Sequence, residues 1–548
     1  MTMPRLLADF WVPSAADLHW FTPELAVLCT IVAVLLAAIA VGRNPHITAM
    51  LVLLGAGCAI LFAQVAESRM TDGVAGPAPA RAAPMLIADS FSAFFKTFLL
   101  VLLAAVTGLW LIGLRQRPPQ AARLFAGNAP EFFTLLLGSA LGMMLMVGTL
   151  NLLMIVLAIE LASMPSYAIV GFNKSDRLGA EASLKYVVFG AITAACMLYG
   201  VSMLYGLYGT LDIPTIAHLA VRRAGESPGT AVLTSVGLVT FGAGIGFKIA
   251  AVPFHFWCPD VFEGAPVEIT AWLSIASKAA GLGLALRVAG ALTSAPSAGQ
   301  VESLWGPMAI AVGAAAAVTC TVGNFAAYRP DNVKRILAYS SIAHAGYMLM
   351  AAAILPLTGP HGEATPSSST FSALVAYLVM YLFMNVGAFG VTAIVSWQTG
   401  SASISAFDGL GRRAPWLAVP MAVCLFSLVG LPPLGGFIAK WWLLYALGRG
   451  AAAQSWLWAL VIVLVLNTLF SLYYYLRIVR VMFVKTGPHE AERPPLAAPL
   501  GGLVLVNACA VMLLIGGTIG IGPVKSLADD AASRIFDSVA GPPIAARH

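Results

Sequence analysis

Long apolar runs, each followed by a short polar or charged stretch, recur along the whole chain. Each run has roughly twenty residues, the length that an α-helix needs to cross the hydrocarbon core of a bilayer. The runs begin near Phe21, Ile47, Phe91, Phe132, Asn151, Glu181, Ala231, Ala265, Gly306, Val333, Phe371, Trp416, Ser455 and Gly501. The pattern predicts an all-α polytopic membrane protein with about fourteen transmembrane helices.

Composition supports a membrane protein and argues against other classes. Apolar residues make up 59% of the 548 residues and charged residues 10%, which is unlike a soluble globular chain. The net charge of +6 does not indicate nucleic-acid binding, because the basic residues lie in short loops between the apolar runs. We therefore expect a lipid bilayer, and no nucleic acid, around this chain.

The charges of the loops predict the orientation in the membrane. Loops after odd-numbered runs hold Arg43, Arg115, Arg117, Arg123, Lys174, Arg177, Arg329, Lys334, Arg335, Arg412, Arg413, Arg480, Lys485 and Arg493. Loops after even-numbered runs hold Arg69, Arg81, Arg222, Arg223 and Arg449. The positive-inside rule places the first group in the cytoplasm and both termini on the non-cytoplasmic side. Because Asp9 and Asp17 precede the first run and no basic segment leads to a short apolar stretch with a cleavage site, we expect an uncleaved first helix.

Two of the apolar runs are interrupted beside a lysine. In the seventh run, Lys248 is followed by Pro253, which lacks a backbone donor and clashes with the carbonyl four residues earlier. The helix should therefore open just past Lys248, in a place where protein or trapped water satisfies the freed backbone groups. In the twelfth run, Gly430 and Pro432 form a similar break before Lys440.

The two breaks lie five runs apart, which predicts an internal repeat. Segments interrupted at corresponding positions of two halves are typical of inverted-repeat transporters, and an odd offset reverses the orientation in the membrane. We expect repeats at residues 131–291 (helices four to eight) and 306–486 (helices nine to thirteen). Residues 1–130 would form three N-terminal helices, and 487–548 the last helix and a short tail.

Several polar residues lie inside the apolar runs or at the breaks. The candidate proton-carrying residues are Glu160, Lys185, Lys248, His255, Lys278, His344 and Lys440. A charge at membrane depth costs about 3 kcal/mol on insertion scales, so each of them is a functional candidate. Burial disfavours the charged lysine and a nearby carboxylate favours it, so a movement of Glu160 relative to Lys248 would switch the lysine between holding and releasing a proton.

Each candidate also has a structural interpretation. Glu160 and Lys248 would then form an inert buried ion pair, and Lys185 would extend to the membrane interface. Lys278 and Lys440 would only hold water, and His255 and His344 would be ordinary buried histidines. The acidic residues Asp260, Glu263 and Glu268 flank a loop, and we expect them to be solvated.

Other motifs in the chain do not indicate a cofactor or a nucleophile. Gly242, Gly244 and Gly246 lack the third glycine of a nucleotide-binding fingerprint, and close helix packing explains them better. Ser340 and Ser341 precede His344 but have no third catalytic partner. The seven cysteines are scattered, so we expect no iron–sulfur cluster, haem or zinc on this chain.

At these motifs the chain resembles the antiporter-like membrane subunits of respiratory complex I, and most of all the subunit N family of bacterial NADH–quinone oxidoreductase. The resemblance covers roughly residues 132–484 and rests on the segments 160–167 (ELASMPSY), 185–186 (KY), 247–257 (FKIAAVPFHFW), 259–266 (PDVFEGAP), 332–347 (NVKRILAYSSIAHAGY) and 436–441 (GFIAKW). A lysine at position 440 argues against the sister family M, which typically has a glutamate there.

This resemblance implies a multi-pass subunit of the cell inner membrane that couples quinone reduction elsewhere in the complex to proton pumping. It places FMN, iron–sulfur clusters and quinone on partner subunits, with no cofactor on this chain. Protons would pass by Lys185, Lys248, His255 and Lys278 toward Lys440 and the far side. Two alternatives stay open: a stand-alone cation/proton antiporter or membrane-bound hydrogenase-type complex, and a purely structural subunit.

Overall fold

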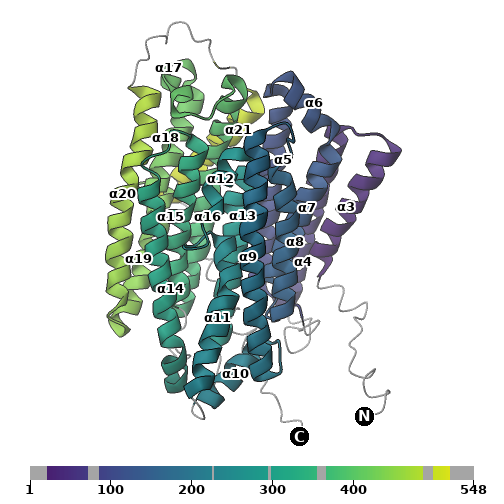
Figure 1. Ribbon diagram of the computed structural model, residues 1–548. Coiled ribbons are helices and arrows are strands. Elements are labelled where there is room, and N and C mark those ends of the chain that lie inside the picture. Colours follow the sequence, from purple (N-terminus) through teal and green to yellow (C-terminus); the bar gives the residue numbers. More distant parts are fainter. Residues whose placement is uncertain are drawn as a thin grey trace.

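A computed structural model of the chain is a bundle of long, roughly parallel helices (Figure 1). It describes residues 21–71, 85–224, 228–293, 298–354, 366–484, 496, 498–518 and 522. Thirteen of the described helices are long and apolar enough to cross a membrane, and a bent pair, Ile404–Arg413 with Pro415–Val429, would make up to fourteen. The prediction of an all-α polytopic membrane protein is confirmed.

The helices follow one another with short connections. Their bounds are α3 (Thr22–Ala40), α4 (Pro45–Thr71), α5 (Ser90–Gln116), α6 (Pro119–Gly127), α7 (Ala129–Val147), α8 (Leu152–Val170), α9 (Arg177–Tyr208), α10 (Ile213–Ala224), α11 (Pro228–Ile249), α12 (Trp257–Gly264), α13 (Val267–Thr293), α14 (Ala298–Ala326), α15 (Val333–Ile354), α16 (Pro366–Thr399), η3 (Ile404–Phe407), α17 (Leu410–Arg413), α18 (Pro415–Val429), α19 (Gly435–Ala453), α20 (Leu457–Phe483) and α21 (Leu500–Thr518). Most of them begin within a few residues of the predicted run starts.

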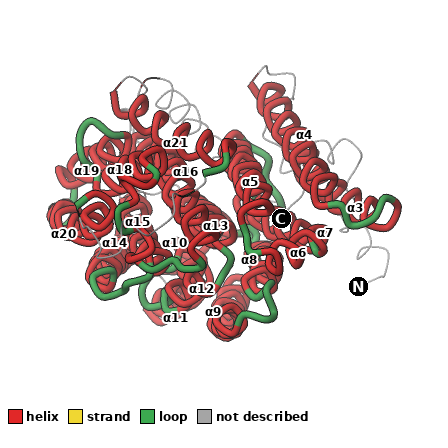
Figure 2. The backbone as a smooth tube through the Cα atoms, turned by 90° about the horizontal axis from the view of Figure 1, so that it is seen from above, coloured by secondary structure: helices red, strands yellow, loops and turns green. Residues whose placement is uncertain are grey.

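Three helices form the centre of the bundle. Nearly every residue of α13 and α15, and most of α16, is buried, whereas α3, α4 and α9 expose most of their length. Seen from above, α13 and α16 lie in the interior and the pair α3 and α4 lies at one edge (Figure 2). The central helix α13 buries the charged residues Glu268, Lys278 and Arg287, whereas the more apolar outer helices expose apolar side chains at the surface of the bundle.

Both predicted breaks are present. Helix α11 ends at Ile249, directly after Lys248, and the chain becomes helical again at Trp257 in α12. Helix α18 ends at Val429, and Gly430 adopts a left-handed conformation (φ 89°) before α19 begins at Gly435. Glycine suits this position because it has no Cβ to clash in that conformation. The assignment of two inverted repeats, at 131–291 and 306–486, stays a prediction.

Two short helices were not predicted. Helix α6 follows α5 and α10 follows α9, and they lie at opposite ends of the bundle (Figure 1). With 9 and 12 residues they are too short to cross a membrane. Helix α10 buries Ile213 and Ile216 and exposes Arg222 and Arg223, which is the amphipathic pattern of a helix that lies along a membrane surface.

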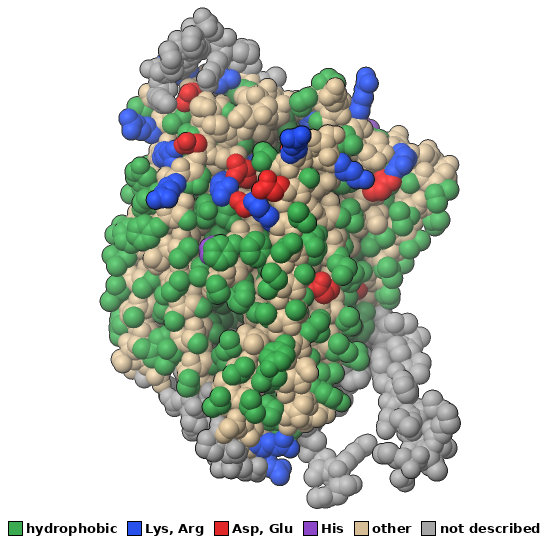
Figure 3. Space-filling model, viewed as in Figure 1, with side chains coloured by type: hydrophobic (Ala, Val, Ile, Leu, Met, Phe, Trp, Pro, Cys, Tyr) green, Lys and Arg blue, Asp and Glu red, His purple; other side chains and the backbone are tan. Residues whose placement is uncertain are grey.

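The charged side chains are distributed unequally between the two ends. Lys and Arg gather at the end that holds α6 and α17, while the sides of the molecule are largely apolar (Figure 3). We call this the basic end; it includes Arg123 of α6 and Arg412 and Arg413 of α17. The opposite end carries the arginine pair of α10. The predicted segregation of basic loops is therefore present in three dimensions.

A buried ion pair joins α5 to the central helix α13. Asp89 is the N-cap of α5 and accepts a hydrogen bond from the backbone N–H of Ser92 at 2.8 Å. Its two carboxylate oxygens accept from Nη1 and Nη2 of Arg287 at 2.8 and 2.7 Å, and both side chains are buried. The bidentate geometry fixes the position of α13 relative to the N-terminal helices.

Replacing only Arg287 should destabilise the protein more than replacing both Arg287 and Asp89. We expect Arg287→Met to cost about 3 kcal/mol, because it leaves a buried carboxylate without its charge partner. The double variant Arg287→Met/Asp89→Asn should recover part of this loss, since asparagine is also a good N-cap. Thermal unfolding of the detergent-solubilised protein measures the difference, and equal melting temperatures for the two variants would contradict the prediction.

Candidate functional site

Lys248 lies on the last turn of α11, at the edge of the break. Its side chain is 1% exposed, and its Nζ has no hydrogen-bond partner among the described residues. The backbone is better satisfied, because Ser277 Oγ of α13 donates to the carbonyl oxygen of Lys248 at 2.5 Å. Gly281 lets α13 approach the Cβ of Lys248 closely. The ammonium group is thus buried without a direct partner, which is unfavourable unless the group has a function.

Glu160 on α8 is the carboxylate that attracts the ammonium group of Lys248. It sits in the middle of α8, half-buried, and the two charges attract each other electrostatically. The neighbouring residues Leu157, Leu161 and Met164 are exposed and apolar. Glu160 therefore lies between the interior, where Lys248 is, and an outward apolar face of α8.

Lys278 continues the series on α13. It is completely buried, and its Nζ lies 3.7 Å from Cys258 Sγ and 3.5 Å from the carbonyl oxygen of Leu273. The ammonium also lies 4.8 Å from the ring centroid of Phe262 and 5.5 Å from that of Trp257. Aromatic faces stabilise a cation only moderately. Among the described residues, no carboxylate lies within hydrogen-bonding distance of this ammonium.

His344 lies on α15, one turn after a residue that contacts Cys258. Cys258 Sγ is 3.9 Å from Ser341 Oγ, one turn before His344 on α15. Nδ1 of His344 lies 2.8 Å from the hydroxyl of Tyr377, and Nε2 lies 3.4 Å from the hydroxyl of Tyr475. A histidine contacted through both ring nitrogens can accept a proton on one side and release one on the other.

Lys440 lies at the second break and has partners that Lys248 lacks. Its Nζ donates to the carbonyl oxygens of Leu428 and Val429, at 3.1 and 2.9 Å. These carbonyls end α18, so the break itself supplies the acceptors. The ammonium also lies 4.9 Å from the ring centroid of Tyr347, which is on the same helix as His344.

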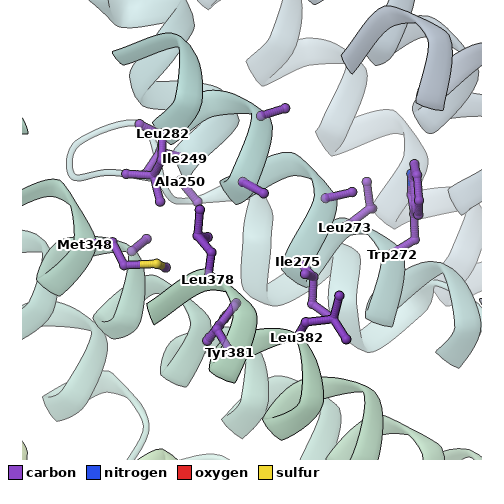
Figure 4. Packing of buried hydrophobic residues seen from close by; sticks show 14 of the residues in the cluster. Ile249, Ala250, Trp272, Leu273, Ile275, Leu282, Met348, Leu378, Tyr381 and Leu382 are labelled. Atoms are coloured by element: carbon purple, nitrogen blue, oxygen red, sulfur yellow. The ribbon is translucent and has the colours of Figure 1, made fainter. Parts of the chain in front are cut away.

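Four of the predicted residues, Lys248, Lys278, His344 and Lys440, are buried inside the bundle, and Glu160 is half-buried at its outer side. We call these five residues the central line. Figure 4 shows part of the apolar core, in which the end of α11, the first break, α13, α15 and α16 contribute Ile249, Ala250, Trp272, Leu273, Ile275, Leu282, Met348, Leu378, Tyr381 and Leu382. The packed surroundings keep the effective dielectric low, so each charge on the line responds strongly to its neighbours.

The two other predicted residues lie elsewhere. Lys185 was expected in an apolar run, but its side chain is 39% exposed and pairs with Glu181 at 2.6 Å and Asp260 at 2.8 Å. Arg335 completes this cluster, 3.0 Å from Asp260. His255 lies within the first break, buried beside Phe256, and its Nδ1 has no hydrogen-bond partner among the described residues.

The sequence analysis was wrong about Glu268 and overlooked Lys96. Glu268 was expected to be solvated, but it is fully buried and pairs with Arg117, whose guanidinium lies 3.8 Å from the ring centroid of Phe125. Lys96 is a further lysine inside an apolar run, and its Nζ lies 2.7 Å from Glu24. Neither pair touches the central line. A charge inside an apolar stretch is a signal that could have indicated Glu268 and Lys96. The sequence gives no such signal for their partners, Arg117 and Glu24.

The two alternatives that the sequence analysis set aside have no support in the structure. A Cβ on Gly244 would overlap Met197 of α9, which confirms that this glycine serves helix packing. Ser340 pairs with Tyr475, and Ser341 Oγ donates to the carbonyl oxygen of Ala338, so neither serine is paired with His344. In the part of the chain that the structure describes, no group of three or more His, Cys, Asp or Glu could hold a metal ion.

Comparison with known proteins identifies relatives of this chain. A family model described as "NADH:quinone oxidoreductase/Mrp antiporter, TM" matches residues 149–471. NADH-quinone oxidoreductase subunit N from Anaeromyxobacter sp. (strain Fw109-5) is 41% identical over 513 residues, which are 91% of this chain and 93% of that protein.

Solved structures share the fold. A chain of respiratory complex I from Thermus thermophilus is 29% identical with a TM-score of 0.71, and the match covers 92% of this chain and 99% of that one. A chain of the Mrp complex from Dietzia sp. DQ12-45-1b has a TM-score of 0.71 at 21% identity, over 96% of this chain and 100% of that one. At that identity the likeness concerns the fold alone.

The buried lysines at two helix breaks and the family match together define an antiporter-like membrane subunit. Within this class, the chain belongs to the subunit N family of NADH-quinone oxidoreductase, the enzyme of respiratory complex I.

The second break depends on a close contact that only glycine permits. The N–H of Gly436 donates to Ser427 Oγ at 3.0 Å, and a Cβ on Gly436 would overlap the backbone carbonyl of Ser427. We expect Gly436→Ala to displace the start of α19 and with it Lys440, lowering proton pumping or assembly of the complex. Gly448→Ala is the matched control on the same helix, because nothing lies within 4 Å of the added methyl group. Equal behaviour of the two variants would contradict this account.

Proposed function

We propose that this subunit carries protons across the membrane along the central line, driven by quinone reduction in partner subunits of NADH-quinone oxidoreductase. The observation that supports this most directly is Lys248, a buried ammonium without a hydrogen-bond partner among the described residues, placed at a helix break and attracted by Glu160. Even a small change in its electrostatic surroundings can make such a group gain or lose a proton.

The coupling step would be a change in the interaction between Glu160 and Lys248. A carboxylate about 4 Å from an ammonium contributes roughly 4 kcal/mol at an effective dielectric near 20. Burial opposes the charged lysine, and this attraction favours it. When Glu160 approaches, Lys248 holds its proton; when Glu160 turns away, the proton passes to Lys278. From there it continues toward His344 and Lys440.

The environment of Glu160 supports a partner subunit on the face of α8. A half-exposed carboxylate among exposed apolar residues would be costly in lipid. A second membrane subunit of the complex, with a basic or polar residue opposite Glu160, would cover it and influence its position. FMN, iron–sulfur clusters and quinone would belong to other subunits of the complex.

The positive-inside rule supports an orientation in the cell inner membrane with the basic end in the cytoplasm and both termini on the other side. In that orientation the cluster of Lys185, Asp260 and Arg335 would face the cytoplasm, and Lys185 would collect protons there rather than hold one at membrane depth. His255, inside the first break, would serve as a further carrier beside Lys248.

Lys248→Met should lower the proton-to-electron ratio of the assembled complex. Methionine fills a similar volume but cannot carry a proton, so the central line would be interrupted at its first lysine. The measurement is NADH-driven proton uptake by inverted membrane vesicles, divided by NADH oxidation. The double variant Glu24→Gln/Lys96→Met is the control, because it removes a buried lysine and its partner away from the line. An unchanged ratio in Lys248→Met would refute the proposed role.

Glu160→Gln should also reduce coupled activity. The amide keeps the shape of the side chain but removes the negative charge whose attraction favours a charged Lys248. Proton uptake and NADH oxidation are measured as above, with Glu131→Gln as the control because that carboxylate pairs with the exposed Arg43, away from the central line. Wild-type coupling in Glu160→Gln would remove this residue from the switch.

A further inference from the structure

A network of buried amides and hydroxyls lies next to Lys440, between α14, α15 and α20. Nδ2 of Asn324 donates to the hydroxyl of Tyr347 at 2.9 Å and to Oδ1 of Asn467 at 2.9 Å. The hydroxyl of Tyr474 donates to Oδ1 of Asn324 at 3.1 Å. Both asparagines are buried. Since Lys440 lies against the ring of Tyr347, the network begins at the last lysine of the central line.

From Asn467 the network continues to an open cavity at the basic end. Nδ2 of Asn467 donates to Thr321 Oγ1 at 3.1 Å. Thr321 lines a cavity of about 980 Å³, together with Arg329, Asp331 and Arg335. Arg329 and Asp331 are exposed, so the cavity reaches the surface. A continuous series of polar groups therefore connects Tyr347, beside Lys440, with water at the basic end.

The same helices are apolar in the opposite direction. Toward the other end of the bundle, α14 contains residues 308–317, α15 residues 348–354 and α20 residues 457–466, and every residue in these three segments is apolar or glycine. Polar side chains that served only to hold helices together would not need to lie on one side of Lys440. The unequal distribution gives the lysine a polar surrounding toward one end of the membrane and a hydrophobic barrier toward the other.

We propose that Asn324, Asn467 and Thr321 form a hydrated route that connects Lys440 with the solvent at the basic end. This inference rests on the proposed function, in which Lys440 exchanges protons. It differs from the expectation that protons pass from Lys440 to the far side, because the polar groups lead to the basic end instead. The cavity is the source of water, and the route exchanges protons between that water and Lys440.

The chemistry of the groups assigns them different roles. The hydroxyls of Thr321, Tyr347 and Tyr474 can each donate one proton and accept another. An amide donates and accepts hydrogen bonds but does not pass a proton on, so Asn324 and Asn467 hold the hydroxyls and water molecules in line. They are positioning residues, and the proton moves along water and hydroxyl groups between the cavity and Lys440.

The test compares two substitutions of Asn467 in the assembled complex. Asn467→Leu fills the space with an apolar side chain and should lower the proton-to-electron ratio of inverted vesicles. Asn467→Ser is smaller and polar, leaves room for water, and should keep a ratio near that of the wild type. Asn507→Leu on α21 is the matched control, because Asn507 bonds Trp416 and its own helix away from the route.

The result distinguishes a hydrated proton route from polar contacts that only hold the helices together. Serine cannot reach both Asn324 and Thr321, so a purely adhesive role predicts that the leucine and serine variants lose thermal stability alike and keep the wild-type ratio. That outcome would overturn the proposal. If Asn467→Leu does not assemble, Thr321→Val takes its place: it keeps the shape of the side chain, removes the hydroxyl at the cavity, and should lower the ratio.

Lys440→Met distinguishes a failure of the route from a failure of the proposed function. If Lys440→Met loses pumping while Asn467→Leu and Thr321→Val keep the wild-type ratio, the route is wrong and the role of Lys440 stands. If Lys440→Met itself pumps normally, the proposed function of Lys440 fails, and the route that serves it fails too.

Discussion

The free-energy cost of a charged lysine in the apolar interior is the constraint on which the centre of this molecule depends. Around Lys248 the chain leaves this cost largely uncompensated: the side chain is buried, and within the described residues Nζ has no hydrogen-bond partner. The break after Ile249 and the bond from Ser277 satisfy the backbone but not the ammonium. The attraction of Glu160, which is partly exposed on α8, offsets part of this cost.

The two breaks meet the same constraint in different ways. At the second break, the free carbonyls at the end of α18 accept hydrogen bonds from Lys440, so its charge is held directly by the backbone. At the first break, Lys248 relies on a carboxylate on another helix. A lysine bound by fixed dipoles keeps a steady preference for its proton, whereas one balanced against a movable carboxylate changes its preference when that carboxylate moves. In the proposed mechanism, Lys248 therefore takes the coupling step, and Lys440 exchanges protons at the end of the central line.

Charges away from the central line hold the helices in place. The pairs Asp89 with Arg287, Glu24 with Lys96, and Glu268 with Arg117 each join helices that are distant in sequence. Buried pairs of this kind add little net stability compared with apolar contacts, but breaking one of them is costly. They therefore favour one arrangement of helices whose apolar surfaces would otherwise pack in several ways. In this arrangement α11 packs against α13, α13 against α15, and α15 against α19.

The sequence by itself determined the fold class, the approximate positions of the spans and both helix breaks, and it named the five residues of the central line as candidates. These depend on local physics: the length of an apolar run, the missing donor of proline, and the cost of a charge at membrane depth. The tertiary structure decided which groups meet. It placed Lys185 in a partly exposed cluster, buried Glu268 against Arg117, and gave Lys440 two carbonyls. Helices with similar apolar faces carry no local signal of their neighbours, so those partners arise only from packing.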